Sequence, residues 1–270
     1  MTAAGGTILD RLADHARERV EEAKQRMSLA EIRHKALSME KGNFAFENAL
    51  KKQDIAFICE CKKASPSKGL IAPEFPYLQI AREYEAAGAD AVSVLTEPKW
   101  FLGSDAYLKE IAENMSIPCL RKDFTVDGYM IYEAKLLGAS AVLLICSILP
   151  EEHVREYIGI CDELGLSALV EAHDKDEVES ALRAGARVIG VNNRNLKDFS
   201  VDTENSRRLR QMIPQEVLFV SESGIGSAED VSRLRQIGAD AVLIGETLMR
   251  AEDKKAKLME LKETGKGAQR

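Results

Sequence analysis

The chain has 270 residues, with 37 Lys or Arg against 44 Asp or Glu, so its formal net charge is −7. This acidic balance argues against nonspecific binding to nucleic acid or to an anionic membrane, and an anionic ligand would need a local positive site. No apolar run reaches the roughly 18 residues that span a bilayer, and the first residues resemble neither a signal peptide nor a transit peptide. The length suits one large α/β domain or two small ones.

The five cysteines are an odd number in a chain without extracellular signals, which predicts reduced thiols and a cytoplasmic location. Cys59 and Cys61 stand two residues apart in an apolar run, so on a strand they would share one face. A zinc site there would lack a second cysteine pair and a nearby histidine. We therefore expect all five to be core residues and no metal site.

The first predicted element is a helix over residues 8–27, where ILDRLADHARERVEEAKQRM carries apolar residues at helical spacing. The segment NFAFENAL then leads into the first strand. We expect residues 1–48 to form a helical extension packed on the main domain, because they carry too little apolar surface for a domain of their own. Residues 49–270 would form a single catalytic domain.

A phrase recurs four times in the rest of the chain, as AAGADAVSVL, LLGASAVLLI, RAGARVIGVN and QIGADAVLIG. Each copy is typical of a helix end, a Gly just after the helix, and an apolar strand. Four further apolar runs alternate with these copies, namely AFICECK, IPCLRKDF, SALVEAHD and EVLFVSES. Eight nearly continuous apolar strands separated by helices predict a parallel sheet. Their regular repeat favours a closed (β/α)8 barrel, the TIM barrel, over an open doubly wound sheet.

Charged residues end the first, third, fifth and seventh of these strands: Glu60, Lys62, Lys122, Glu171 and Glu222. Reactive residues of such barrels sit at the C-terminal strand ends, and alternate strands contribute to one interior layer. We therefore expect these side chains to converge at one mouth, where mutual pKa shifts would build an acid/base site. On the first strand, Glu60 and Lys62 should face inward with Ile58. Taken singly, each charge is better explained as a solvated strand end or a structural ion pair.

Glycine-containing loops follow the last two strands. Ser223 and Gly224 come just after strand seven, and Gly245 ends strand eight and opens a helix. Such loops are the usual phosphate site of this fold, because glycine lets backbone N–H groups approach the phosphate oxygens. Ser65 would donate to the same phosphate, since strands one and eight are neighbours in a closed barrel. The alternative is a pair of tight turns without a ligand.

Aromatic residues follow strands two and three. Trp100, Phe101 and Phe124 are placed to line an apolar pocket for an aromatic ring, although core packing explains each of them equally well. His173 lies just beyond Glu171, and nothing in the sequence marks it as more than a loop residue. The sequence thus predicts one mouth with groups for an aromatic ring, for acid/base chemistry and for a phosphate.

The motifs ECKKASPSKG, LRKDF, LVEAHD, GVNNRNL, VSESGI and IGETLMR occur in this order, and together they resemble the indole-3-glycerol phosphate synthase family over the whole chain. The resemblance implies a (β/α)8 barrel and a carboxy-lyase of tryptophan biosynthesis, with no cofactor and no metal. Its substrate would be 1-(2-carboxyphenylamino)-1-deoxyribulose 5-phosphate, and its products indole-3-glycerol phosphate, carbon dioxide and water. The glycine motifs also occur in other phosphate-binding barrels, so the reaction rests on ECKKASPS and LRKDF.

Carried over residue by residue, the resemblance implies roles for the strand-end residues. Lys122 would be the general acid that protonates the ketone oxygen, oriented by Glu60. Lys62 would pair with the substrate carboxylate and assist dehydration, and Glu171 would transfer protons. Other substrate contacts are implied for Asn192, Glu222, Arg194, Phe101, Phe124, Leu143 and Leu196. The phosphate would be held by Ser65, Ser223, Gly224, Gly245 and the backbone N–H of Glu246.

One residue departs from the pattern of some relatives, which have a hydroxyl residue after the last strand's glycine where this chain has Glu246. A carboxylate facing a phosphate would repel it, so we expect only the backbone of Glu246 to contribute. We also expect a phosphorylated small-molecule substrate, no nucleic-acid or membrane partner, and a monomer or a weak homodimer.

Two alternatives stay open at this point. One is another phosphate-binding barrel enzyme, such as phosphoribosylanthranilate isomerase or a Schiff-base aldolase. An aldolase needs a lysine with a depressed pKa, and three carboxylates near two lysines argue against it. The other is a barrel that binds a phosphorylated metabolite as a regulator without turnover, which an intact acid/base set argues against.

Overall fold

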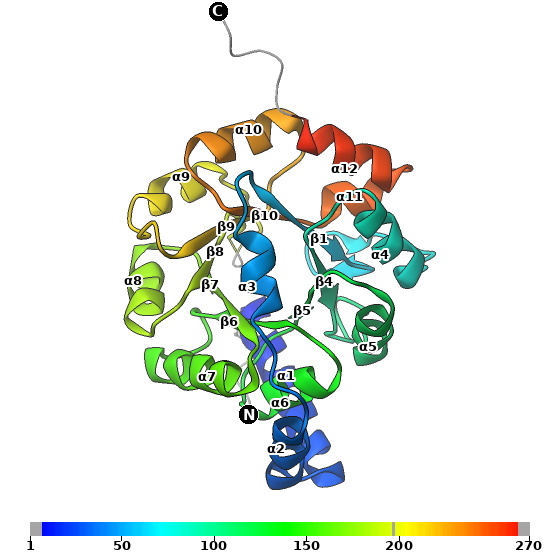
Figure 1. The fold of residues 1–270 in the computed structure, drawn as a ribbon, viewed down its shortest axis with the longest axis vertical. Coiled ribbons are helices and arrows are strands. Elements are labelled where there is room, and N and C mark those ends of the chain that lie inside the picture. The colour runs from blue at the N-terminus through cyan, green and yellow to red at the C-terminus, as the bar shows by residue number, and fades with distance from the viewer. Residues whose placement is uncertain (1–6, 196–197, 264–270) are drawn as a thin grey trace, which may run out of the picture.

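The computed structural model describes residues 7–195 and 198–263, and its centre is a closed barrel of eight parallel strands. Every barrel strand pairs with its neighbours in chain order, and β1 closes the ring by pairing with both β4 and β10 (Figure 1). The (β/α)8 prediction is confirmed. The barrel strands are β1 (Ala56–Cys61), β4 (Ala91–Leu95), β5 (Cys119–Lys122), β6 (Ala141–Ile145), β7 (Ser167–Ala172), β8 (Val188–Asn192), β9 (Leu218–Glu222) and β10 (Ala241–Ile244).

Helices surround this barrel, as Figure 1 shows. They are α4 (Tyr77–Ala86), α5 (Asp105–Asn114), α6 (Tyr129–Leu136), α7 (Glu151–Leu164), α8 (Lys175–Arg183), α9 (Glu204–Arg210), α10 (Ala228–Gln236), α11 (Glu246–Arg250) and α12 (Lys254–Lys262). The glycines of the recurring phrase, such as Gly88 and Gly138, have φ angles of +81° and +83° just after their helices. Only glycine adopts this left-handed conformation without strain, which explains the repeat. No helix in the described ranges is long and apolar enough to cross a membrane.

Strand β1 shows how the alternation of side chains divides the core. Ile58 belongs to the apolar cluster inside the barrel, whereas Phe57, Cys59 and Cys61 belong to the layer between the barrel and the helices. Burial raises the pKa of the Cys59 thiol and of the Cys61 thiol. These cysteines are therefore inert packing residues of the outer layer.

Two segments outside the eight-strand pattern close the barrel at its two ends. Helix α3 (Ala45–Leu50) lies across the N-terminal ends of the strands, where the backbone N–H of Glu47 donates to Ser167 Oγ at 3.2 Å (Figure 1). Helix α1 (Ile8–Arg26) covers the opposite end, and its Leu9, Leu12 and Ala16 pack into the interior cluster. Helix α2 (Leu29–Ser38) connects them and packs on α6.

Buried ion pairs attach α1 to the strand ends. The Arg19 guanidinium donates two hydrogen bonds to the Asp123 carboxylate, at 2.6 and 3.0 Å, and Asp123 is 2% exposed. His15 Nδ1 lies 3.1 Å from Glu97 Oε1, and Glu97 in turn accepts backbone N–H groups of the loop after β4. Because Asp123 follows Lys122 directly, the helix fixes the end of β5.

We expect Arg19→Ala to lower the free energy of unfolding by about 3 kcal/mol, because a buried carboxylate at Asp123 then lacks its cation. Urea unfolding measures the change. The matched control is Arg17→Ala on the same helix, whose partner Asp14 is 70% exposed, and its cost should stay below about 1 kcal/mol. Equal, small effects of both variants would mean that the Arg19 pair does not hold the helix.

Candidate active site

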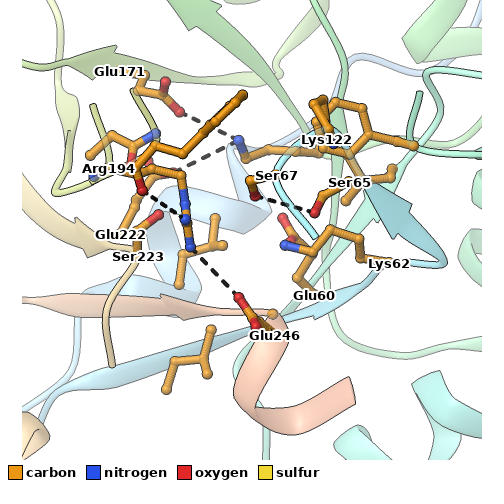
Figure 2. A pocket seen from close by; sticks show the side chains of 18 of the residues that line it. Glu60, Lys62, Ser65, Ser67, Lys122, Glu171, Arg194, Glu222, Ser223 and Glu246 are labelled. Atoms are coloured by element: carbon orange, nitrogen blue, oxygen red, sulfur yellow. Dashed lines mark hydrogen bonds and ion pairs between the residues drawn. The ribbon is translucent and has the colours of Figure 1, made fainter. Parts of the chain in front are cut away.

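A cavity of about 430 Å³ opens at the C-terminal ends of the strands. The structure brings all five predicted strand-end charges together on its wall, as Figure 2 shows for Glu60, Lys62, Lys122, Glu171 and Glu222. They come from β1, β5, β7 and β9, which are alternate strands of the ring. The two-residue period of each strand turns all of these side chains inward.

Lys122 stands between two acidic side chains. Its Nζ donates to Glu171 Oε2 at 3.4 Å and lies 3.8 Å from Glu222 Oε2. Burial alone would lower the pKa of Lys122, but the charges of Glu171, Glu222 and Glu60 outweigh it and raise the pKa. The ammonium therefore keeps its proton at neutral pH, which is the state that an acid needs before it donates.

The two acids beside Lys122 differ in their protonation. Burial favours the neutral form of Glu171, but Lys122 and His173 outweigh it and lower its pKa. Burial and the neighbouring Glu171 raise the pKa of Glu222 to about 8. Two carboxyl groups held this close avoid a second negative charge, so one of them retains its proton. At neutral pH the pair is one carboxylate, Glu171, and one carboxylic acid, Glu222.

A glycine on the neighbouring strand makes room for Glu222. A Cβ built on Gly190 would lie 2.1 Å from Glu222 Oε1, closer than any real contact. Gly190 pairs with Glu171 across the β7–β8 ladder, so a larger residue would enter the space between the two acids. Nothing in the sequence singles out this glycine, because the clash is visible only once β8 and β9 are side by side.

Glu60 and Lys62 form a second pair, with Lys62 Nζ 2.7 Å from Glu60 Oε1. Lys62 directly follows β1 and is the ion-pair partner of Glu60, whereas the orienting of Lys122 by Glu60 stays a prediction. Glu60 acts on Lys122 through its charge. Burial disfavours the carboxylate of Glu60, yet Lys62 and Lys122 lower its pKa. Gly245 borders this pair, since a Cβ there would lie 2.3 Å from Glu60 Oε1.

Another part of the cavity wall is polar and adjoins the Glu60–Lys62 pair at Gly245. The predicted phosphate residues all line it: Ser65, Ser223, Gly224, Gly245 and Glu246. Residues Ser223 and Gly224 have φ angles of +68° and +81°, so the chain turns sharply there. Ser65 lies in a small antiparallel hairpin of β2 (Ala64–Ser65) and β3 (Gly69–Leu70), outside the eight predicted strands, and its Oγ is 3.5 Å from Ser67 Oγ.

The Glu246 side chain lies among cations. Its carboxylate is 3.1 Å from Arg250 Nε and 3.6 Å from both Lys68 Nζ and Arg194 Nη2 (Figure 2). These three cations offset the charge that was expected to repel a phosphate. Lys68 and Arg250 were not singled out from the sequence, although Lys68 stands in the SPSKG loop and Arg250 follows Glu246 by one helical turn.

An apolar wall faces Lys122. Phe101 and Phe124 lie with ring centroids 6.0 Å apart, and Leu143 adjoins them. Trp100 is absent from this wall; its ring packs edge-on against His15 of α1. Helix α1 itself contributes apolar residues to the wall, which the sequence did not reveal: Ile8, Leu9 and Leu12.

Two further predicted residues lie on the β8 side. Asn192 lines the cavity, and its Oδ1 accepts the backbone N–H of Arg194 at 3.0 Å. Arg194 Nη1 donates to the backbone oxygen of Phe199 at 3.2 Å. Leu196 lies outside the described residues. In the described part of the chain, no group of three or more His, Cys, Asp or Glu side chains could hold a metal ion.

A family model described as indole-3-glycerol phosphate synthase matches residues 9–261, most of the chain. The chain belongs to the indole-3-glycerol phosphate synthase family.

Relatives that carry the name indole-3-glycerol phosphate synthase agree with this. The one from Ruminiclostridium cellulolyticum is 58% identical over 256 residues, which cover 94% of this chain and 98% of that relative. The one from Endomicrobium trichonymphae is 51% identical over 257 residues, covering 95% of this chain and 100% of that relative.

Solved structures of other proteins share the barrel. A chain of the tryptophan synthase complex from Pyrococcus furiosus has a TM-score of 0.58 at 16% identity, covering 77% of this chain and 98% of that one. The 3-hexulose-6-phosphate synthase of Salmonella typhimurium has a TM-score of 0.63 at 15% identity, with 77% and 96% covered. At such identities these likenesses show the fold alone.

The protonation of Glu222 in this indole-3-glycerol phosphate synthase family member has a measurable consequence. An unfolded glutamate loses its proton near pH 4.3, whereas Glu222 in the fold keeps it to about pH 8. Above pH 4.3 the folded chain binds the extra proton, so this group's contribution to stability declines as the pH rises and is lost by about pH 8. Relative to the wild type, Glu222→Gln should therefore gain stability between pH 5 and pH 9. Urea unfolding across this range measures it, and a constant difference would contradict the protonated state.

Proposed function

We propose that this chain converts 1-(2-carboxyphenylamino)-1-deoxyribulose 5-phosphate to indole-3-glycerol phosphate, carbon dioxide and water. The observation that carries the proposal is the Lys122 ammonium, held between Glu171 and Glu222 in a cavity whose wall also carries an aromatic pair and the glycine-containing loops. The substrate has parts that suit these groups: an aromatic ring, a ketone and a phosphate. Phe101 and Phe124 suit the ring.

Ring closure begins at the ketone. In our proposal the ring carbon that bears the carboxylate attacks the ketone carbon, while Lys122 Nζ–H donates a proton to the ketone oxygen. Carbon dioxide then leaves, and its bonding electron pair returns to the ring. The charge that develops on the oxygen is stabilised by an ammonium already in place, at no cost of reorganisation.

Dehydration follows from the neighbouring groups. Lys62 would first pair with the substrate carboxylate and then assist departure of the hydroxyl group as water, with Glu60 holding its Nζ in place at 2.7 Å. Glu171 would transfer protons in this step. Glu222, as a neutral acid, would contact the anilino nitrogen or a substrate hydroxyl together with Asn192.

The phosphate would bind at the polar part of the cavity wall, through Ser65, Ser223, Gly224, Gly245 and the N–H of Glu246, with Arg194 beside it. The cations around the Glu246 side chain support this placement, since they supply the local positive charge that an acidic chain needs. Leu143 and Leu196 would complete the enclosure of the aromatic ring.

The geometry favours this lyase over a Schiff-base aldolase. A Schiff-base lysine must lose its proton to attack a carbonyl, whereas the surrounding carboxylates raise the pKa of Lys122. We further propose a single catalytic domain over residues 49–270 with residues 1–48 as its extension, a monomer or weak homodimer, and a cytoplasmic location. Helix α1 supports the extension as part of the site, because Leu9 and Leu12 line the cavity.

The deciding experiment supplies the anilino-ribulose phosphate to the purified protein and follows indole fluorescence. A rising signal that depends on the enzyme concentration supports the proposal. If the substrate binds but no product forms, the protein is a barrel that binds the metabolite without turnover, and the proposal is wrong.

We expect Lys122→Ala to lower kcat by roughly 10²–10⁴-fold, the usual worth of a general acid, while the substrate still binds. Fluorescence turnover gives kcat, and calorimetric titration with the substrate gives the affinity. Lys109→Ala is the matched control, because this lysine is 58% exposed on α5 and should leave turnover unchanged. Near-normal kcat in Lys122→Ala would remove it from the acid role.

A further inference from the structure

His173 joins the catalytic carboxylate to a second carboxylate behind it. It follows β7 directly, two residues after Glu171, and its Nε2 lies 3.4 Å from Glu171 Oε1. On the other side of the ring, Nδ1 is 3.1 Å from Glu177 Oε2 and 3.2 Å from Ser147 Oγ. Contacts thus run in a line from Glu177 through His173 and Glu171 to Lys122.

The contacts of Glu177 fix which ring nitrogen faces Glu171. Glu177 Oε2 also accepts the backbone N–H of His173 at 2.7 Å, and its Oε1 accepts Ser147 Oγ–H at 2.5 Å. Burial would raise the pKa of Glu177, but His173 and Ser147 lower it, so Glu177 is ionised and only accepts. Nδ1 therefore carries a hydrogen, and Nε2 is the nitrogen free to exchange a proton with Glu171.

Nothing else described in the structure satisfies Nε2. The atom is buried and makes no well-aligned hydrogen bond within residues 7–195 and 198–263. The acidic groups that act on the ring are Glu177 and Glu171, with Glu222 beyond them. Burial lowers the pKa of His173, but the hydrogen bond to Glu177 and the charge of Glu171 outweigh it and raise the pKa, which favours a second proton on the ring.

A second cavity lies behind the ring. It has a volume of about 690 Å³ and is lined by polar residues that include His173, Glu177, Ser147 and Asn205. Glu171 lines the catalytic cavity but not this one, and His173 lines this one but not the catalytic cavity. The imidazole is therefore placed between Glu171 and the contents of the second cavity.

The proposed reaction needs a proton from outside. Its substrate carboxylate leaves as neutral carbon dioxide and its ketone oxygen leaves as water, so each turnover takes up one proton. Lys122 gives its proton to the ketone oxygen and must regain one. Glu171 is the group in hydrogen-bond contact with Lys122. A proton that reaches Glu171 can therefore restore the ammonium.

We propose that His173 is the proton relay of this site: Nε2–H gives its proton to Glu171 Oε1, Nδ1–H stays bonded to Glu177, and Nε2 then regains a proton from water supplied by the second cavity. The inference rests on the proposed function. This step moves a proton without any change of oxidation state, because one N–H bond breaks as one O–H bond forms.

The test compares kcat of the wild type, His173→Ala and His173→Asn, with and without added imidazole. We expect both variants to lose on the order of 10²-fold in kcat with little change in KM, since proton transfer and not binding is impaired. Imidazole should restore part of the activity of His173→Ala, because the second cavity leaves space for it. The control is His153→Ala, which removes an exposed histidine stacked on Tyr157. Its kcat should equal that of the wild type and should not change when imidazole is added.

Two results would overturn the relay. One is near-normal kcat in His173→Ala. The other is full activity of His173→Asn without an imidazole response in His173→Ala, because Asn can hydrogen-bond Glu171 but cannot pass a proton, and the role would then be positioning alone.

A measurement that needs no catalysis can test this inference separately from the proposed function. The chain has four histidines, so the histidine ring signals in a 15N NMR spectrum are few enough to resolve. The signal that disappears in His173→Asn belongs to His173. Glu171→Gln should shift the Nε2 resonance and lower the pH at which His173 loses its proton. An unchanged titration would overturn the relay even in an active enzyme. A wild type without turnover would overturn the proposed function, while the titration would still decide the contact.

Discussion

The structure of the site depends on the balance between buried positive and negative charges. Glu60, Glu171 and Glu222 face Lys62 and Lys122 inside the barrel mouth, so three carboxylates against two ammonium groups would leave one negative charge. Uncompensated buried charge is costly, and the cheapest remedy is a proton. Glu222 takes it, because it is the acid with no ammonium of its own within 3.5 Å. The cluster is then neutral, and each member has a defined protonation state before a ligand arrives.

Such a cluster requires space as well as charge, and two glycines provide it. Gly190 on β8 and Gly245 after β10 occupy positions where any Cβ would collide with Glu222 or Glu60. Gly190 stands on the strand next to that of Glu222, and Gly245 directly follows the strand next to that of Glu60, so the barrel register determines which acids fit. Gly245 therefore makes room for the Glu60–Lys62 ion pair and also belongs to the backbone turn proposed for the phosphate.

The sequence predicted what depends on local periodicity. Apolar runs, the glycines after helices and the alternation on β1 located the strands, and alternate strands then placed five charges at one mouth. Pairing partners were harder to predict, because the choice of Lys62 by Glu60 depends on side-chain directions at a strand end. Trp100 was misplaced because its partner His15 lies 85 residues earlier in the chain. The sequence predicts only a loop residue at His173 because it follows β7, and its contacts with Glu171 and Glu177 become visible only in the folded chain.

The N-terminal helix contributes more to the site than its position in the chain suggests. Lys122 contacts Glu171, while the next residue, Asp123, accepts hydrogen bonds from Arg19 of α1 and from Thr96 Oγ1–H, the latter at 2.5 Å. The end of β5 is thus held both by the helix and by Glu171. Leu9 and Leu12 of the same helix also supply part of the cavity wall. A barrel without this helix would leave Asp123 charged without its guanidinium and the cavity open to water. Helix α1 therefore forms one side of the candidate site and is joined to the barrel by Asp123, the residue that follows the proposed acid.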